Sequence, residues 1–486
     1  MTETRGLIIN GADTSALDGR TCQDLNPYSG EVVATVAAAS AGDITRAVDA
    51  ASDALPGWAA TPPTGRQRLL LRAADLVEER ADQAAALMTA ETGATGGWAM
   101  FNVGLAASIF REAAAAATRP IGEVLATDNP GALALAVRQP AGVVAAFAPW
   151  NAPIILGARA VATPLAVGNT VVMKASEEAP VACALFIADV FRAAGLPPGA
   201  LNVITNARDD APMVAETLIG DPRVRRVNFT GSTGTGRAIA EIAARHLTPV
   251  VLELGGKNSV IVLDDADLDS AVDAVAFGAY LNSGQICMSA DRVIVQRGIA
   301  EAFTARLARR AAGLRCGDPA DPQTVVGPLI SESAAVRVSK LVAEAADQGA
   351  SVLAGGGPPR GAVYPATVLA SVDPSMRVYT DEIFGPVCTV ITASDPEHAV
   401  AIANDSPYGL TAGVLTGDLA LGLDIARRLR TGIVHVNDQS IDDEPQAPFG
   451  GVKDSGYGRF GGSAGVDAFT DLRWITMQPR PRPVPF

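Results

Sequence analysis

Residues 141–173 read AGVVAAFAPWNAPIILGARAVATPLAVGNTVVM and contain one charged side chain, Arg159. This apolar stretch is long enough to cross a membrane, but Pro149, Pro153 and Pro164 interrupt any continuous helix of that length. The β-rich runs at its two ends, with a helical pattern between them, are typical of a buried strand–helix–strand unit. The stretch therefore predicts the core of an α/β domain.

The same alternation of strand-like and helical segments continues toward the C-terminus. The first series of β-rich runs covers 143–147, 170–173, 201–204, 226–229 and 250–252. A second series covers 259–263, 292–296, 352–353, 387–391 and 433–436, with a helix expected from residue 268. Strands that alternate with helices are typical of parallel sheets covered on both faces. We therefore expect two α/β domains, the first of them doubly wound.

The region before the first strand is expected to be helical. The apolar spacing from Ile44 to Thr118 predicts outer helices, with a capping box at Thr64–Gln67 and a helix end at Gly93. After them, the turn signal Asp128–Gly131, followed by alternating apolar residues, predicts a hairpin within 122–139.

Composition excludes several classes of protein. Hydrophobic residues make up 48% and charged residues 19% of the 486, which describes a folded chain of at least two domains. The net charge of −14 repels phosphate, so neither nucleic acid nor an anionic membrane is expected as a partner. The five cysteines form no CxxC or Cys/His cluster, which argues against disulfides and a metal site. Since Met1–Asn10 carries no secretory pattern, we expect a reducing, cytoplasmic location.

Cys287 is the candidate nucleophile. It lies in NSGQICMS, residues 282–289, a glycine-containing turn after an apolar helical segment. A loop in that position can expose a thiol, whereas an isolated cysteine is otherwise a small buried hydrophobic residue.

Glu253 is the candidate base. It ends an apolar strand in LELGGKN, residues 252–258, where a buried carboxylate is costly unless it has a use. Desolvation raises the pKa of such a group and suits it to accept a proton from water, while a salt-bridged structural glutamate is the alternative.

Two further motifs supply hydrogen-bond donors. Asn151, in PWNAP at 149–153, offers an amide to an oxyanion, although an asparagine between prolines is also a common turn residue. The glycine-rich segment FTGSTGTGR, 229–237, follows a strand and opens a helix, as a pyrophosphate site requires. Its spacing is GxxGxG and not the GxGxxG of the usual dinucleotide fingerprint.

Seven motifs in register resemble the aldehyde dehydrogenase superfamily, and the resemblance covers nearly the whole chain. They are PWN, VVMKASE, FTGSTGTG, LELGGKN, GQICMS, EIFGP and PFGGVKDSGYGR. The resemblance implies an enzyme in which Cys287 attacks an aldehyde, Asn151 and a main-chain N–H hold the oxyanion, and hydride leaves for NAD(P). Glu253 then activates the water that hydrolyses the thioester.

The resemblance also implies the cofactor and its contacts. The implied cofactor-binding residues are Trp150, Lys174, Glu177, Gly231, Ser232, Gly255, Glu382 and Phe384. A carboxylate at Glu177 accepts the 2′-hydroxyl of NAD and repels a 2′-phosphate, so NAD is preferred and NADP remains possible. Glu178 is a rival for this role.

Arg159 separates this chain from relatives that carry an aromatic residue there. PWNAPIILGAR together with GQICMS resembles the branch acting on benzaldehyde, salicylaldehyde and vanillin. The implied substrate-binding residues are Arg159, Ile155, Ile286, Met288 and Phe449, with Trp150 as a further apolar wall. Arg159 either contacts a ring substituent or pairs with Asp442, Asp443 or Glu444.

The implied architecture has three parts, namely a Rossmann-like cofactor domain, an α/β catalytic domain and a small β bridging element. We assign residues 1–120 and 141–253 to the first, 254–469 to the second, and 121–140 with 470–486 to the third. The hairpin and the strand-like tail are expected to meet another subunit in a homodimer or homotetramer. The alternatives are an aliphatic-aldehyde or semialdehyde dehydrogenase, a CoA-acylating relative, which Glu253 disfavours, and a non-catalytic relative.

Overall fold

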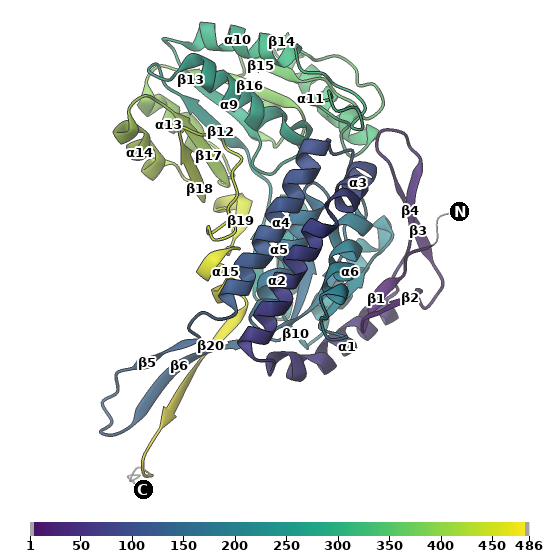
Figure 1. Ribbon diagram of the computed structural model, residues 1–486. Helices are drawn as coiled ribbons and strands as arrows, with labels where there is room; N and C mark the ends of the chain where they lie inside the picture. The colour runs from purple at the N-terminus through teal and green to yellow at the C-terminus, as the bar shows by residue number, and fades with distance from the viewer. Residues whose placement is uncertain (1–3, 482–485) are drawn as a thin grey trace.

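Parallel strands organise both large lobes of the computed structural model, which describes residues 4–481 and residue 486 (Figure 1). The first lobe is built on an eight-stranded sheet in the order β19-β11-β10-β7-β8-β9-β1-β2. Its strands are β1 (Leu7–Ile9), β2 (Ala12–Thr14), β7 (Val143–Phe147), β8 (Thr170–Lys174), β9 (Leu201–Ile204), β10 (Val224–Thr230), β11 (Val250–Glu253) and β19 (Gly456–Tyr457). The five central strands are parallel, which confirms the doubly wound sheet predicted from the sequence.

The second lobe is built on a seven-stranded sheet in the order β14-β15-β16-β13-β12-β17-β18. Its strands are β12 (Asn258–Val262), β13 (Ala290–Gln296), β14 (Ser351–Ala354), β15 (Thr367–Ala370), β16 (Val387–Ala393), β17 (Thr411–Leu415) and β18 (Ile433–Val436). Only β14 pairs antiparallel. The sequence pattern missed β15 and β17, because both are short and carry small residues such as Gly413 with weak β-propensity.

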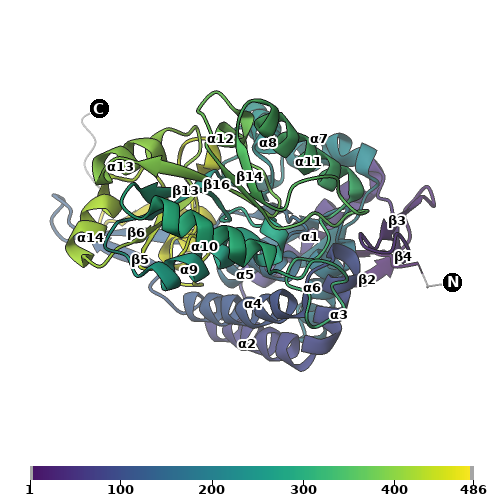
Figure 2. The same ribbon diagram turned by 90° about the horizontal axis from the view of Figure 1, so that it is seen from above.

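Helices cover both sheets, and those before β5 confirm the predicted helical region. In the first lobe they are α1 (Ala41–Ala59), α2 (Pro63–Glu79), α3 (Ala81–Thr92), α4 (Gly96–Ala116), α5 (Pro153–Ala166), α6 (Phe186–Ala193), α7 (Ala211–Gly220) and α8 (Thr233–Arg245). Those of the second lobe are α9 (Leu268–Tyr280), α10 (Ala300–Ala312), α11 (Glu332–Asp347), α12 (Arg377–Thr380), α13 (Pro396–Asn404) and α14 (Leu419–Arg428). In Figure 2, α2 and α4 lie side by side, and α4 also packs on α5. No helix in the described part of the chain is both long and apolar enough to span a membrane.

One predicted cap is wrong and one predicted helix end is confirmed. The N-cap of α2 is Pro62 without a side-chain cap, and Pro63 begins the helix, so Thr64 lies inside the first turn. Proline's fixed φ starts the helix there without a capping hydroxyl. Ser40 instead forms a capping box with Asp43 at α1. Gly93 ends α3 in the left-handed conformation, at φ 69°.

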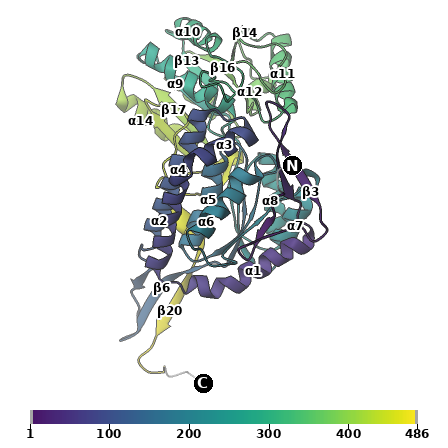
Figure 3. The same cartoon turned by 45° about the vertical axis from the view of Figure 1, so that its right-hand side comes forward.

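A three-stranded arm projects from the first lobe (Figures 1 and 3). The predicted hairpin is confirmed as β5 (Gly122–Leu125) and β6 (Leu133–Pro140). After α15 (Gly462–Ala468), the tail forms β20 (Thr470–Met477), which pairs antiparallel with β6 of its own chain. Pairing with another subunit and the three domain assignments stay predictions, and residues 1–3 and 482–485 of those assignments lie outside the described residues. A separate two-stranded sheet joins β3 (Thr21–Leu25) and β4 (Val32–Ala37).

Candidate active site

An apolar cavity of about 1070 Å³ lies where α4 and α5 of the first lobe face α9 of the second. Most of its wall is aliphatic or aromatic, including Trp98, Phe101, Leu105, Ile155, Phe277, Ile286, Met288, Ile441 and Phe449. The polar groups in the wall include Asn151, Arg159, Cys287 and Asp443. The five residues expected at the substrate site, Arg159, Ile155, Ile286, Met288 and Phe449, therefore line one cavity, whereas Trp150, the further wall expected, is not among its lining residues and packs against Phe384 instead.

Strained backbone places Cys287 in this wall. After α9 ends, Asn282 and Ser283 adopt left-handed conformations with φ of 49° and 57°, which non-glycine residues seldom do. Gly284 follows at φ 70°, and a Cβ there would lie 2.1 Å from the carbonyl oxygen of Gly385. The turn therefore depends on glycine, and it presents the partly buried Cys287 to the cavity.

Asn258, the first residue of β12, holds the nucleophile loop from behind. Its Nδ2 donates to the carbonyl oxygens of Cys287 at 2.7 Å and of Ser289 at 3.0 Å. Because the two carbonyls lie on either side of Met288, this one amide fixes the path of the chain around the thiol.

Asn151 lies beside the nucleophile loop with its amide already oriented. Its Nδ2 donates to the carbonyl oxygen of Gln285 at 3.0 Å. The main-chain carbonyl oxygen of Asn151 accepts from Nε1 of Trp98 at 3.1 Å and from Nδ2 of Asn282 at 3.0 Å, which fixes the backbone that carries the amide. An amide NH₂ has two hydrogens, so one remains to be donated to an oxyanion in the cavity.

Glu253 ends β11 as expected, and it is 1% exposed. Neither of its carboxylate oxygens has a hydrogen-bond partner among the protein's N and O atoms. Burial raises the pKa of Glu253 to about 8, and the nearby Arg159 opposes this shift. Burial also raises the pKa of the Cys287 thiol well above its usual value, with the charges of Glu253 and Glu382 adding to the effect. The two groups are therefore close enough to influence each other's protonation.

Arg159 makes the ion pair that was one of its two expected roles. Its guanidinium bonds the carboxylate of Asp443, and both side chains are nearly buried, at 7% and 8% exposure. The guanidinium carbon also lies 4.3 Å from the ring centroid of Phe449. Of the other two candidate partners, Asp442 accepts the N–H of Asp443 at 2.8 Å and lies 3.9 Å from His435, and Glu444 accepts from Gln446.

A second set of residues lies at the carboxyl ends of β8, β10 and β11, the edge of a doubly wound sheet where a nucleotide is expected to bind, and this set is called the cofactor groove below. Ser232 caps α8, so the free N–H groups of that helix face the end of β10. Lys174 Nζ lies 2.5 Å from Glu177 Oε1, which also accepts from Nδ2 of Asn206 at 2.9 Å. Glu178 pairs with Arg208 instead. This arrangement favours Glu177 over its rival.

The other end of the groove brings Glu382 and Phe384 close to Trp150. Glu382 Oε1 accepts the N–H of Gly256 at 3.0 Å, and burial raises the pKa of Glu382 to about 7. The rings of Phe384 and Trp150 meet edge to face at 5.7 Å.

The residues of this groove fit a dinucleotide. A helix N-terminus suits pyrophosphate, and carboxylates at both ends suit ribose hydroxyls. The glycines leave room for the present positions of their neighbours, since a Cβ on Gly255 would lie 2.3 Å from the Glu382 carboxylate and one on Gly231 would lie 2.6 Å from the Phe229 ring. Among the described residues, no group of three or more His, Cys, Asp or Glu could hold a metal ion.

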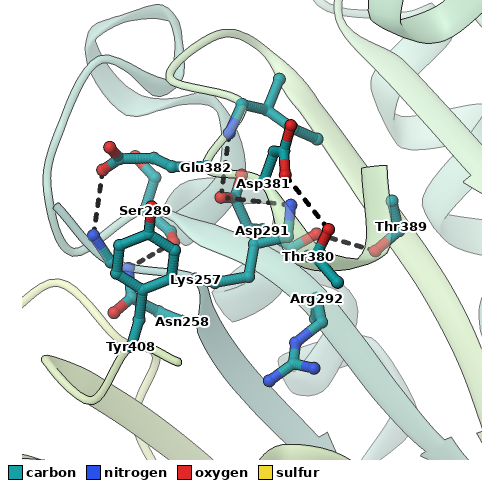
Figure 4. Close-up of polar contacts among 12 residues, drawn as sticks. Lys257, Asn258, Ser289, Asp291, Arg292, Thr380, Asp381, Glu382, Thr389 and Tyr408 are labelled. Atoms are coloured by element: carbon teal, nitrogen blue, oxygen red, sulfur yellow. Dashed lines mark hydrogen bonds and ion pairs between the residues drawn. The ribbon is translucent and has the colours of Figure 1, made fainter. Parts of the chain in front are cut away.

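Sequence reasoning missed a buried polar cluster beside the groove. It contains Lys257, Asn258, Asp291 and Arg292, close to Glu382 (Figure 4). Lys257 and Asn258 belong to the quoted LGGKN motif, and a lysine next to an apolar strand requires a buried partner. That signal was present, but the partner on β13 could not be identified from spacing.

Comparison with known proteins finds a consistent set of relatives. A family model described as "Aldehyde dehydrogenase family" matches residues 14–475. A vanillin dehydrogenase from Pseudomonas sp. strain HR199 is 52% identical over 479 residues, covering 99% of each chain. A benzaldehyde dehydrogenase [NAD(+)] from Pseudomonas putida is 42% identical over 463 residues, covering 95% of this chain and 94% of that protein.

Solved structures agree with the sequence relatives. The crystal structure of a salicylaldehyde dehydrogenase from Pseudomonas putida G7, complexed with salicylaldehyde, superposes with a TM-score of 0.97. The two chains are 43% identical, and the match covers 99% of this chain and 100% of that one.

Proposed function

We infer the reaction of this protein from one premise, that the chain belongs to the aldehyde dehydrogenase family. It is an oxidoreductase that oxidises aldehydes to carboxylic acids, and its substrates are aromatic aldehydes of the vanillin, salicylaldehyde and benzaldehyde type. The observation that carries this function is the position of Cys287, in an apolar cavity, with Asn151 and Glu253 beside it.

We propose that Cys287 forms the covalent intermediate. The thiol loses its proton to solvent, the thiolate attacks the carbonyl carbon, and the developing oxyanion accepts hydrogen bonds from Asn151 Nδ2 and a main-chain N–H of the nucleophile loop. The nicotinamide cofactor, when bound, supplies the hydride acceptor for this reaction. Asn151 stabilises the charge only if its amide is already oriented, which the bond from Nδ2 to Gln285 favours, while Trp98 and Asn282 fix the backbone of Asn151.

Glu253 is proposed to activate water for thioester hydrolysis. A carboxyl with a pKa of about 8 is a much stronger base than an exposed glutamate, and it is partly deprotonated near neutral pH. Water that loses its proton to Glu253 attacks the acyl carbon, and the Cys287 sulfur leaves. This role favours hydrolysis over transfer of the acyl group to CoA.

NAD is the proposed cofactor, with NADP as a weaker alternative. Glu177, which is bonded to Lys174 and Asn206, would accept the hydroxyls of the adenine-side ribose and repel a 2′-phosphate. Glu382 and Phe384 would hold the ribose at the nicotinamide end.

The apolar wall of the cavity supports an aromatic substrate. Ile155, Ile286, Met288 and Phe449 offer flat and aliphatic surfaces, and the Arg159–Asp443 pair adds one polar side. An aliphatic or semialdehyde substrate is the alternative within the family.

A homo-oligomer is proposed from the arm. Leu472 and Trp474 of β20 are 63% and 74% exposed, and Val124 of β5 is 73% exposed, so the arm carries uncovered apolar side chains at both edges. A homodimer or homotetramer would cover them. The cytoplasmic location stays a prediction.

One assay tests the reaction and the substrate class together. Purified protein is given benzaldehyde, vanillin, salicylaldehyde or hexanal with NAD or NADP, and NADH or NADPH absorbance is followed. We expect kcat/KM for the aromatic aldehydes to exceed that for hexanal by about tenfold or more, with NAD preferred. Faster oxidation of hexanal would favour the aliphatic alternative, and no turnover with any aldehyde would indicate a non-catalytic relative.

A further inference from the structure

Lys257 is a lysine whose side chain has no exposure to solvent. It follows the two glycines after β11, and its ammonium has one ionic partner, Asp291 Oδ2 on β13, at 3.4 Å (Figure 4). No shorter hydrogen bond to the ammonium is present in the described structure. Burying two charges in this way carries a large desolvation penalty, which a contact as long as 3.4 Å offsets poorly. The pair therefore needs an explanation beyond stability.

Asp291 connects the pair to the cofactor groove. The same Oδ2 that faces Lys257 accepts the N–H of Ile383 at 3.3 Å (Figure 4). Ile383 lies between Glu382 and Phe384, the two residues assigned to the nicotinamide-side ribose. The carbonyl oxygen of Ile383 is bonded as well, because Arg337 Nη2 donates to it at 2.6 Å.

The two glycines that precede Lys257 also contact Glu382 directly. The N–H of Gly256 donates to Glu382 Oε1 at 3.0 Å, and a Cβ on Gly255 would collide with the same carboxylate. Residues 255–257 therefore hold Glu382 directly and hold its neighbour Ile383 through Asp291.

The backbone of Phe384 is strained, so residues 382–384 need the contacts described above to keep their conformation. It adopts the left-handed conformation, with φ of 48°, which is unfavourable for a bulky side chain and persists only where the surroundings impose it. Without the hydrogen bonds to Glu382 and Ile383, residues 382–384 would relax to a less strained conformation. The Glu382 carboxylate and the Phe384 ring, which contacts Trp150, would then move.

We propose that the buried Lys257–Asp291 pair is a positioning device, which holds Glu382 and Phe384 against the nicotinamide end of the cofactor. It acts through these residues and does not touch the reacting atoms. The inference rests on the proposed function, because it assigns the pair to the hydride-transfer half of that reaction and leaves the nucleophile unaffected.

The test replaces Lys257 by Met, which keeps the length of the side chain and removes its charge. We expect kcat with benzaldehyde and NAD to fall about tenfold to a hundredfold, since small misplacements have effects of that size. Benzaldehyde deuterated at the aldehyde carbon should then show a larger isotope effect than in the wild type, because hydride transfer has become limiting.

Two measurements separate positioning from damage to the fold. The affinity for ADP, which reaches only the adenine end, and the rate of Cys287 alkylation by iodoacetamide should both stay within twofold of wild type. Lys340→Met, which removes an exposed lysine on α11 of the same lobe, is the matched control and should leave every readout unchanged.

Asp291→Ala is the second variant, for use if Lys257→Met does not fold. It removes both the acceptor for the Ile383 N–H and the ionic partner of Lys257, so it should give the same pattern of loss. An unchanged kcat and isotope effect in the folded variant would overturn the inference, as would a parallel loss of ADP affinity and alkylation rate. Wild-type protein without aldehyde oxidation would instead contradict the proposed function itself.

Discussion

Two buried ionisable groups of the active site, Glu253 on the side of Cys287 and Arg159 on the side of the cavity wall, lie in different surroundings. Around Cys287, the carboxylate of Glu253 is 1% exposed, and neither oxygen has a partner among the protein's N and O atoms. The Arg159 guanidinium, which is 7% exposed, is bonded to Asp443 and lies over Phe449. The cost of desolvating Glu253 is offset only in part, by the charge of Arg159, whereas Arg159 has a direct ionic partner in Asp443.

The difference indicates which groups react and which shape the site. A carboxyl without a partner has a raised pKa and remains able to take up a proton during a reaction. The Arg159 guanidinium already has an ionic partner in Asp443 and lies over the Phe449 ring, so its charge is largely compensated before a ligand binds. We therefore expect Arg159 to act mainly as part of the cavity wall. Replacing residues on the two sides should therefore affect different properties, namely turnover on the first and stability on the second.

The largest effect is expected on the reacting side, for Cys287→Ala. Without sulfur no covalent intermediate forms, so NADH production from benzaldehyde should fall by about 10⁴-fold or more. NAD binding, measured by quenching of tryptophan fluorescence, should be retained, because the groove does not use the thiol. Substantial dehydrogenase turnover in this variant would refute the proposed chemistry.

Glu253→Gln should separate the two halves of the reaction. The acylation burst of NADH should remain, whereas the steady-state rate should fall by about 10²–10⁴-fold, the usual contribution of a general base. The expected product is an acyl-enzyme, visible by mass spectrometry as added mass on the peptide containing Cys287.

The same residue predicts the pH dependence. The base form of Glu253 is deprotonated, and its pKa is raised to about 8, so the wild-type steady-state rate should increase as pH rises through about 8. The glutamine variant should lose this dependence. A steady-state rate equal to wild type, or the same pH profile in both proteins, would count against water activation by Glu253.

The smallest effect on turnover is expected on the paired side, for Asp443→Ala. This change leaves Arg159 buried without its partner, which should lower the free energy of unfolding by about 3–5 kcal/mol. Asp442→Ala is the matched control, since Asp442 is 47% exposed and its loss should change stability by about 0.5 kcal/mol or less. Denaturant unfolding measures both, and equal stabilities would show that the Arg159–Asp443 pair is not structural.

Local patterns predicted the strands best where buried runs were rich in valine and isoleucine. The strands β7 and β12 are of this kind, and both appear close to the expected bounds. The short strand β17 contains Gly413 and is a strand because it pairs with β12 on one side and β18 on the other. Such a strand depends on its neighbours, so local propensity could not reveal it.

The sequence by itself determined the type of chemistry, because a cysteine in a glycine-containing turn, a glutamate at a strand end and an asparagine after a strand are local features. Only the tertiary structure decided that these groups meet, that Arg159 pairs with Asp443, and that Asp291 bonds the peptide of Ile383, 92 residues away. The physical reason is that propensity and capping depend on neighbours along the chain. Burial, ion pairing and pKa depend on neighbours in space.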